Sequence, residues 1–191
     1  IAVVGSHGQI GQRLVALNAI PMECDILDAD QIKNEYDRTS PDIIINATGI
    51  GVNEAEMDYE KAVNINVWGH NKLCEVVGDR KVVLLSSEYV FDGVAGNYRE
   101  DDDPAPINNY GITKFAAEGV NALYYNKTIR LSRTFNRKLG CDIQQYVSAL
   151  SRGEEIDVPT FFIKNYVHTD FAARAIMYFA ENYLDMPEMM H

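Results

Sequence analysis

Short apolar runs alternate with longer segments of helical period along the 191 residues of this chain. The runs are continuous rather than alternating with polar residues, which indicates strands buried on both faces, as in a parallel sheet. Parallel strands need helical crossovers, so the pattern predicts an α/β fold with a Rossmann-type, doubly wound parallel sheet. We expect strands at 1–4, 43–45, 82–85 and 128–131, and helices at 9–19 (closed by Pro21), 30–38, 59–77 and 109–123.

The pattern becomes looser beyond Arg133. A helix at 142–152, a strand at 155–158 and a helix at 169–183 are expected there. We interpret 1–191 as one domain, with a core at about 1–133 and the first elements of a small substrate lobe in 134–191. Residue 1 lies inside an apolar run, and the sequence stops soon after an amphipathic segment. We therefore expect a piece of a longer protein, with the C-terminal lobe truncated.

A glycine-rich turn joins the first strand to the first helix. Its three glycines match the dinucleotide-binding fingerprint: one permits the tight turn, one lets a pyrophosphate approach the backbone, and one lets helix and strand pack closely. The start of the helix then offers free N–H groups to phosphates. His7 has no evident partner and is interpreted as only lining the loop. The turn predicts binding of NAD or NADP by Gly5, Gly8, Gln9, Ile10 and Gly11.

An acidic residue about 20 positions after the first glycine is expected to meet the adenosine ribose. Glu23 and Asp25 both fit this spacing, and Asp25, followed by Ile26, is favoured beside the adenine. No arginine has a clear place for a 2′-phosphate, although Arg13 is near in sequence. The choice between NAD and NADP stays open at this point.

A serine, a tyrosine and a lysine follow in the order that proton transfer to a carbonyl oxygen requires. Ser87 follows the buried run 82–85, while Tyr110 and Lys114 lie four apart on one helix face. A phenol with a pKa of ~10 is a poor acid–base catalyst at neutral pH. A lysine ammonium and an oxidised nicotinamide nearby would lower that pKa. Tyr–Lys pairs alone are common on surfaces, but the ordered set predicts catalytic roles for Ser87, Tyr110 and Lys114.

These motifs resemble the extended short-chain dehydrogenase/reductases, and within them the dTDP-4-dehydrorhamnose reductases and their sugar-nucleotide-reductase relatives. Residues 86–93 are similar to the signature Ser-Thr-Asp-Tyr-Val-Phe-Asp-Gly, with Ser87 in place of threonine and Glu88 in place of aspartate. Residues 100–106 resemble the family's acidic, proline-containing loop, and 108–114 its Tyr-Gly-x-x-Lys helix. The segments 46–49, 63–69 and 166–172 are also similar to family segments, whereas the second strand is shortened.

The resemblance implies NAD(P)H-dependent reduction of a 4-keto sugar nucleotide. Tyr110 would donate the proton, Ser87 would hold the oxygen, and Lys114 would bind the nicotinamide ribose. The resemblance adds Ala47, Thr48, Gly49, Asn66 and Ser86, together with Tyr110 and Lys114, to the cofactor-binding residues, and it makes Ser87, Glu88 and Tyr89 substrate contacts. No metal ligands are assigned. A sugar-nucleotide epimerase or dehydratase is an alternative, because Glu88 beside Ser87 could act as a further acid or base. A non-catalytic regulatory subunit, like the β subunit of methionine adenosyltransferase, is another.

Composition restricts the partners. With 17 basic and 28 acidic residues the formal charge is −11, which argues against nucleic acid. No run approaches the ~20 apolar residues of a membrane span, and three scattered cysteines are typical of reduced thiols. We expect a soluble, cytoplasmic protein. The apolar faces at 64–77, which include Trp68, and at 109–123 can form either core or a homodimer interface, and core burial is favoured.

Overall fold

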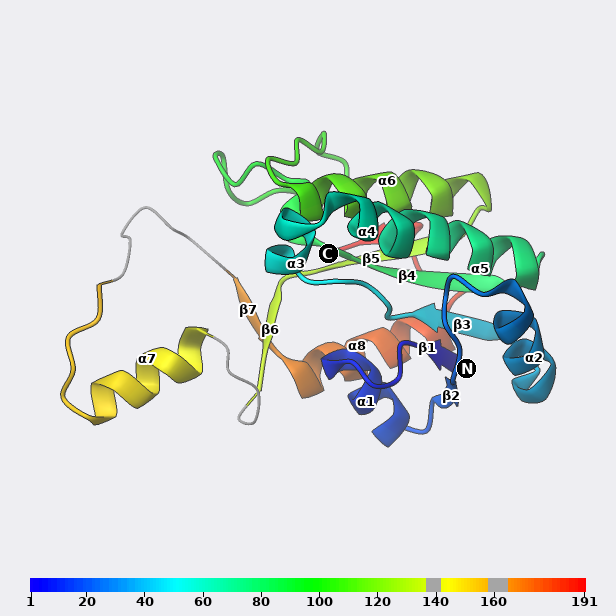
Figure 1. Cartoon of the computed structure of the whole chain (residues 1–191), viewed down its shortest axis with the longest axis horizontal. Helices are drawn as coiled ribbons and strands as arrows, with labels where there is room; N and C mark the ends of the chain where they lie inside the picture. Colours follow the sequence, from blue (N-terminus) through cyan, green and yellow to red (C-terminus); the bar gives the residue numbers. More distant parts are fainter. Residues whose placement is uncertain (137–141, 158–164) are drawn as a thin grey trace.

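The computed structural model describes residues 1–136, 142–157 and 165–191. Its centre is a parallel sheet in the order β2-β1-β3-β4-β5-β8 (Figure 1). Both neighbours of β1 pair with it in parallel, Ala2 standing opposite Ile20 on one side and Ile44 on the other. This is the doubly wound sheet expected from the sequence. Its strands are β1 (Ala2–Val4), β2 (Ile20–Met22), β3 (Ile43–Asn46), β4 (Lys81–Ser87), β5 (Lys127–Leu131) and β8 (Met189–Met190).

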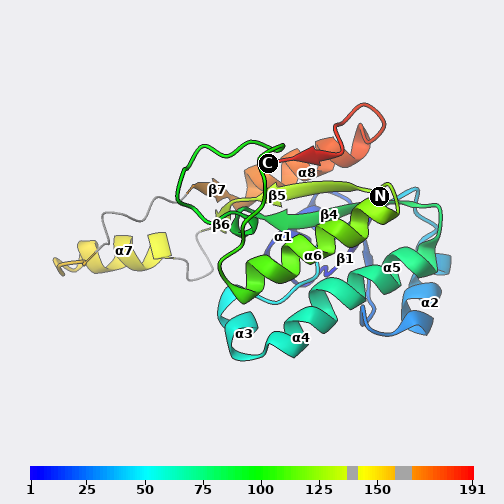
Figure 2. The same cartoon turned by 90° about the horizontal axis from the view of Figure 1, so that it is seen from above.

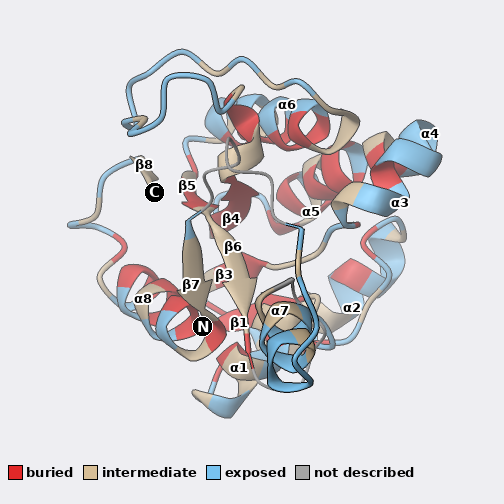
Figure 3. Ribbon diagram, turned by 90° about the vertical axis from the view of Figure 1, so that its left-hand side faces the viewer, coloured by how far each residue is buried: buried red, intermediate tan, exposed pale blue. Residues whose placement is uncertain are grey.

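Helices cover both faces of the sheet. One face is covered by α1 (Gln9–Ala16) and α8 (Thr169–Glu181), and the other by α2 (Ala29–Thr39), α5 (His70–Val77) and α6 (Asn109–Leu123). Figure 2 shows α5 and α6 side by side. The buried sides of these helices face the sheet in Figure 3.

Alternate strand residues enter opposite cores. Val3, Ile45 and Val83 pack with residues of α1 and α8, whereas Ala2, Ile44 and Val82 pack with residues of α2 and α5. Successive side chains of a strand point to opposite faces, so a sheet covered on both sides needs apolar residues at every position. Burial on both faces of the sheet therefore explains the continuous apolar runs in the sequence.

The expected helix at 59–77 is a succession of α4 (Tyr59–Val63), a π-helix η1 (Asn64–Gly69) and α5, and a further short helix, α3 (Val52–Met57), precedes it. Within η1, Gly69 packs closely on the core, because a Cβ there would lie 2.7 Å from a methyl carbon of Ile26. The π-helix therefore brings Gly69 into close contact with Ile26, and it also carries Asn66.

Several boundaries differ from the prediction. The first helix ends at Ala16, and Asn18 adopts a left-handed conformation (φ 72°). Pro21 does not close that helix but lies inside β2. This strand pairs only with β1 among the described residues, and a sheet edge tolerates proline because no partner needs its N–H.

The later part of the chain contains elements that the sequence did not predict. The strands β6 (Arg133–Phe135) and β7 (Tyr166–His168) form a separate two-stranded parallel sheet, and β8 pairs with β5. α7 spans Asp142–Ser151, close to the prediction, and Figure 1 shows it away from the main sheet. Residues 155–157 form no strand, and 158 lies outside the described residues. α8, which lies beyond residue 133, packs into the main core. The interpretation of 1–191 as one domain with a division near residue 133 stays a prediction.

Candidate active site

A cavity of about 480 Å³ opens at the carboxyl ends of the central strands, a volume typical of ligand pockets. The chain passes from β2 across β1 to β3, so the order of the strands reverses between β1 and β3. Ligands of open α/β sheets bind at such a point. The cavity is lined by Gly8, Gln9 and Ile10, by Ala47 through Val52, by Leu85, Ser86, Ser87 and Tyr89, by Tyr110 and Lys114, and by Leu131 through Thr134.

The glycine-rich turn is built for close approach. Gly5 has φ 85°, and a Cβ there would lie 2.8 Å from the backbone of Ala47, the first residue after β3. A Cβ at Gly11 would lie 2.1 Å from the Gly5 carbonyl oxygen, so helix and turn could not pack as they do. No side chain caps the start of α1 at Gly8, which leaves N–H groups for an anion. These features fit the pyrophosphate of a dinucleotide.

Ser87 and Tyr110 meet on the floor of the cavity. Ser87 is the last residue of β4, is buried, and hydrogen-bonds to the Tyr110 phenol. The Tyr89 ring stands edge-on to the Tyr110 ring, with 5.8 Å between centroids. Burial raises the pKa of Tyr110 to about 12, while the Ser87 hydrogen bond lowers it. At neutral pH the phenol therefore carries its proton and can donate it.

Lys114 lies one turn further along α6. Its side chain is buried, and Nζ donates a hydrogen bond of 2.9 Å to the carbonyl of Leu85 in β4. Burial lowers the pKa of Lys114 to about 8, and the Glu118 carboxylate raises it. Nζ lies 6.0 Å from the centroid of the Tyr110 ring. In this structure the pKa of Tyr110 is set by burial, by the Ser87 hydrogen bond and by Tyr89, and the expected lowering by Lys114 is not among these influences.

The start of α6 is fixed by its own N-cap and by contacts with two other segments. The Asn108 side chain accepts a hydrogen bond from Gly111 N at 2.7 Å and caps the helix. Glu56, from α3, accepts one from Asn109 N at 2.7 Å. A Cβ at Gly111 would lie 2.1 Å from the carbonyl oxygen of Tyr89, in the 3₁₀ turn η2 (Glu88–Val90). These contacts hold Tyr110 against Ser87.

Asn66 lies behind the cavity and joins two of its walls. Its Oδ1 accepts a hydrogen bond from Ile50 N at 3.2 Å, and its Nδ2 donates one to Thr113 Oγ1 at 2.9 Å. Thr113 in turn donates to the Tyr110 carbonyl. Asn66 belongs to η1, and π-turns are frequent at functional sites. Its place is therefore that of a support for α6 and for the loop after β3.

A buried ion pair lies beside Lys114, and the sequence did not indicate it. Arg130 of β5 binds Glu118 of α6 through Nη2 at 2.8 Å and Nε at 3.0 Å. Ser86 Oγ donates to the same carboxylate at 2.5 Å. Glu118 follows Lys114 by four residues on the same helix face, which is the one local signal that could have shown it.

Some of the expected site residues do not line the cavity. Asp25 is exposed, and its carboxylate accepts a hydrogen bond from Leu27 N; Ile26 is buried in the core; Glu88 lies in η2. Their binding roles stay predictions. Conversely, Arg133 and Thr134 line the cavity from β6, a strand that the sequence did not predict.

The interpretation of His7 as a lone loop residue is wrong. Its Nε2 lies 2.7 Å from Oε2 of Glu23, the residue that follows β2. Residues 7 and 23 are brought together by the parallel pairing of β1 and β2, which a local pattern does not reveal.

In the described ranges, no group of three or more histidines, cysteines or acids could hold a metal ion. Nor does any described helix have both the length and the apolar character needed to cross a membrane.

Comparison with known proteins agrees with this geometry. Residues 1–191 match the family described as RmlD substrate binding domain. A dTDP-4-dehydrorhamnose reductase from Aggregatibacter actinomycetemcomitans is 30% identical over 151 residues, 71% of this chain and 51% of the relative. Methionine adenosyltransferase 2 subunit beta from Danio rerio is 32% identical over 98 residues, 51% of this chain and 30% of the relative.

Among solved structures, the dTDP-4-dehydrorhamnose reductase from Bacillus anthracis in complex with NADP superposes with a TM-score of 0.86 at 24% identity, covering 96% of this chain and 70% of that one. At this identity the likeness is one of fold. The chain spans about half or less of the length of the two curated relatives named above.

Proposed function

The chain belongs to the RmlD substrate binding domain family, and from this premise we propose that it carries the active site of an NAD(P)H-dependent reductase of 4-keto sugar nucleotides. One observation carries the proposal. The hydrogen-bonded Ser87 and Tyr110 hydroxyls lie on the same cavity as the uncapped start of α1. A proton donor and a phosphate-binding turn thus share one crevice.

The cofactor would be NAD or NADP. The start of α1, with Gln9 and Ile10, would hold its pyrophosphate. Ala47, Thr48, Gly49 and Ser86 would lie along the rest of the molecule, and Lys114 beside the nicotinamide ribose. When bound, the reduced nicotinamide supplies a hydride to the keto carbon.

Residues of the chain would supply the proton to the substrate oxygen, orient this oxygen and stabilise the charge that develops. Tyr110, whose raised pKa keeps it protonated at neutral pH, donates its proton to this oxygen. Ser87, held at the end of β4, orients the oxygen by a hydrogen bond. The Lys114 ammonium stabilises negative charge that develops on the phenol oxygen. Tyr89 lines the cavity beside Tyr110 and would contact the sugar.

The test is oxidation of NADH and NADPH across a panel of nucleotide-linked keto sugars, using the full-length protein. Replacing Tyr110 by Phe should reduce turnover by the ~10²–10⁴-fold typical of general acid catalysis. Tyr125→Phe, at a position that is 94% exposed, is the matched control and should change nothing. Full turnover by Tyr110→Phe would refute the assigned roles.

A regulatory subunit is the second candidate, because the chain is also 32% identical to a β subunit of methionine adenosyltransferase. Stimulation of that enzyme without oxidation of NAD(P)H would favour it. An epimerase or dehydratase has less support, since Glu88, the additional acid or base that it would use, does not line the cavity. Tightly retained cofactor without net consumption would favour this reaction.

We also propose a homodimer. Core burial accounts for Leu73, Cys74 and Val77 but not for Trp68, Ile112 and Phe115, which are 57%, 39% and 42% exposed on η1 and α6. These two elements pack against each other, and exposed apolar patches often mark interfaces. Light scattering should give twice the monomer mass, and Trp68→Glu or Phe115→Glu should give monomers, unlike Tyr178→Glu on α8. A monomeric parent protein would contradict the dimer.

We place the protein in the cytoplasm as part of the same proposal. Cys24 and Cys74 are free thiols, as is typical of a reducing compartment. Cell fractionation with an antibody to the protein would test the location.

A further inference from the structure

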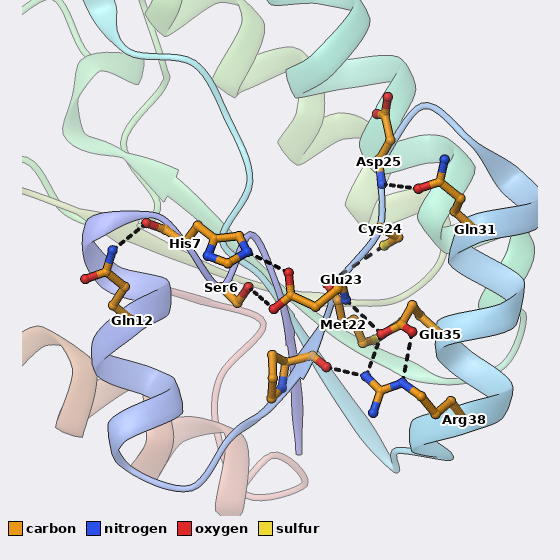
Figure 4. Close-up of polar contacts among 11 residues, drawn as sticks. Ser6, His7, Gln12, Met22, Glu23, Cys24, Asp25, Gln31, Glu35 and Arg38 are labelled. Atoms are coloured by element: carbon orange, nitrogen blue, oxygen red, sulfur yellow. Dashed lines mark hydrogen bonds and ion pairs between the residues drawn. The ribbon is translucent and has the colours of Figure 1, made fainter.

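Glu23, directly after β2, is hydrogen-bonded to the glycine-rich turn. Its Oε1 accepts a hydrogen bond from Ser6 Oγ at 2.8 Å, and its Oε2 lies 2.7 Å from His7 Nε2 (Figure 4). Ser6 and His7 stand between the first two glycines of the turn. The two contacts therefore hold the carboxylate in a fixed orientation at the edge of the turn that would bind the cofactor.

The position of Glu23 is that of a ribose acceptor. In dinucleotide-binding folds, the acid at the end of the second strand accepts hydrogen bonds from the hydroxyls of the adenosine ribose. Asp25, the other residue with suitable spacing, uses its carboxylate within its own loop by accepting from Leu27 N. A carboxylate has about four acceptor positions, so its bonds to Ser6 and His7 leave capacity for a ribose. The Glu23 side chain is 48% exposed and accessible for it.

The surrounding charges oppose a 2′-phosphate. The two arginines that could neutralise one are already engaged: Arg38 binds Glu35 and the Pro21 carbonyl, and Arg13 pairs with Asp170 at 3.0 Å. Figure 4 shows the Arg38 guanidinium turned toward Glu35. A phosphate dianion on the ribose would therefore lie against the Glu23 carboxylate, and neither of these two arginines would be available to neutralise it.

We propose that Glu23 makes this cofactor site selective for NAD(H) over NADP(H). The inference rests on the dinucleotide site proposed above and adds the residue that chooses between the two cofactors. Ser6 and His7 are positioning residues, since they orient the carboxylate.

The test is equilibrium binding of NADH and NADPH to the full-length protein, followed by nicotinamide fluorescence at fixed ionic strength. The parent protein should bind NADH about 10–100-fold more tightly, the scale expected for one unfavourable contact between like charges. Glu23→Gln should reduce this preference by about 10-fold or more, mainly by strengthening NADPH binding. Glu23→Asp keeps the charge and should retain a preference for NADH. Asp42→Asn removes the same charge at a side chain that is 96% exposed and should leave the ratio unchanged.

The outcomes separate the two proposals. If neither nucleotide binds the parent protein, the dinucleotide site itself is refuted. Equal binding of both nucleotides, a preference for NADPH, or an unchanged ratio in a folded Glu23→Gln variant would overturn the selectivity alone.

Discussion

Two glycines on the same helix should respond in opposite ways to the same substitution. Gly111 and Gly119 both lie inside α6, where replacing glycine by alanine normally stabilises by about 1 kcal/mol. At Gly119, which is exposed, a new Cβ meets no atom within 4 Å, so the full gain is expected. At Gly111 the new Cβ would lie 2.1 Å from the Tyr89 carbonyl oxygen and 3.0 Å from its carbon.

The magnitude follows from that contact. To reach an ordinary separation of 3.4 Å, α6 and η2 must move apart by about 1.3 Å, and the obstructing atoms are backbone. Overpacking of this kind costs about 1–3 kcal/mol, which exceeds or cancels the gain in helix propensity. Gly111→Ala should therefore be less stable than Gly119→Ala by about 1–3 kcal/mol. Because Tyr110 is the neighbouring residue and Ser87 precedes η2, turnover should also fall by about 100-fold.

Urea unfolding of both variants and of the parent protein measures the first quantity, and the keto-sugar assay measures the second. Gly119→Ala is the matched control, since it makes the same chemical change in the same helix. Equal stabilisation by both substitutions, with full activity, would show that the close packing of α6 on η2 does not position Tyr110.

Two further predictions concern buried charges. The pKa of Lys114 in the folded protein, about 8, lies below its ordinary 10.5, so the unfolded chain binds more protons between these values and stability should rise with pH across this window. Burial raises the pKa of the Cys24 thiol to about 11 and that of Cys74 to about 12, so both thiols lower stability as pH rises above about 9, equally in every variant. From pH 8 to 10 the change in stability with pH, measured by urea unfolding, should therefore be more positive in the parent protein and in exposed Lys33→Met than in Lys114→Met; equal slopes in all three would contradict the prediction. Glu118→Gln leaves Arg130 buried without its ionic partner and should lower the free energy of unfolding by about 3–5 kcal/mol. The exposed control Glu75→Gln should change the free energy of unfolding by no more than about 0.5 kcal/mol. Similar losses of stability in both variants would show that the buried pair adds little.

The helix that carries Tyr110 and Lys114 was predictable because its signals are local. Pro104 and Pro106 precede it, Asn108 caps it, and the apolar period continues to Leu123; the observed bounds are Asn109–Leu123. The parallel sheet was predictable for a similar reason, since continuous apolar strands record burial on both faces. Both features can be predicted from patterns among residues that are close together in the sequence.

The features that sequence reasoning missed depend on pairing between distant segments. β6 and β7 join residues 133 and 166, and neither strand has a local pattern of its own. Pro21 opposed a strand locally, and only the edge position of β2 makes it acceptable. The partnership of His7 with Glu23 and that of Glu118 with Arg130 likewise exist only after the strands have been placed side by side.

The buried pair also explains how a charged lysine can be kept at the cavity floor. Tyr110, Lys114 and Glu118 lie on one face of α6 at intervals of four residues, so the neutral phenol, the ammonium and the carboxylate follow one another into the protein. Burial alone lowers the pKa of Lys114, and Glu118 opposes this effect. Arg130 and Ser86 in turn satisfy the oxygens of the Glu118 carboxylate. β4 and β5 thus act on the Lys114 ammonium through Glu118, and under the proposed function the sheet would contribute to the proton chemistry of the helix as well as to its position.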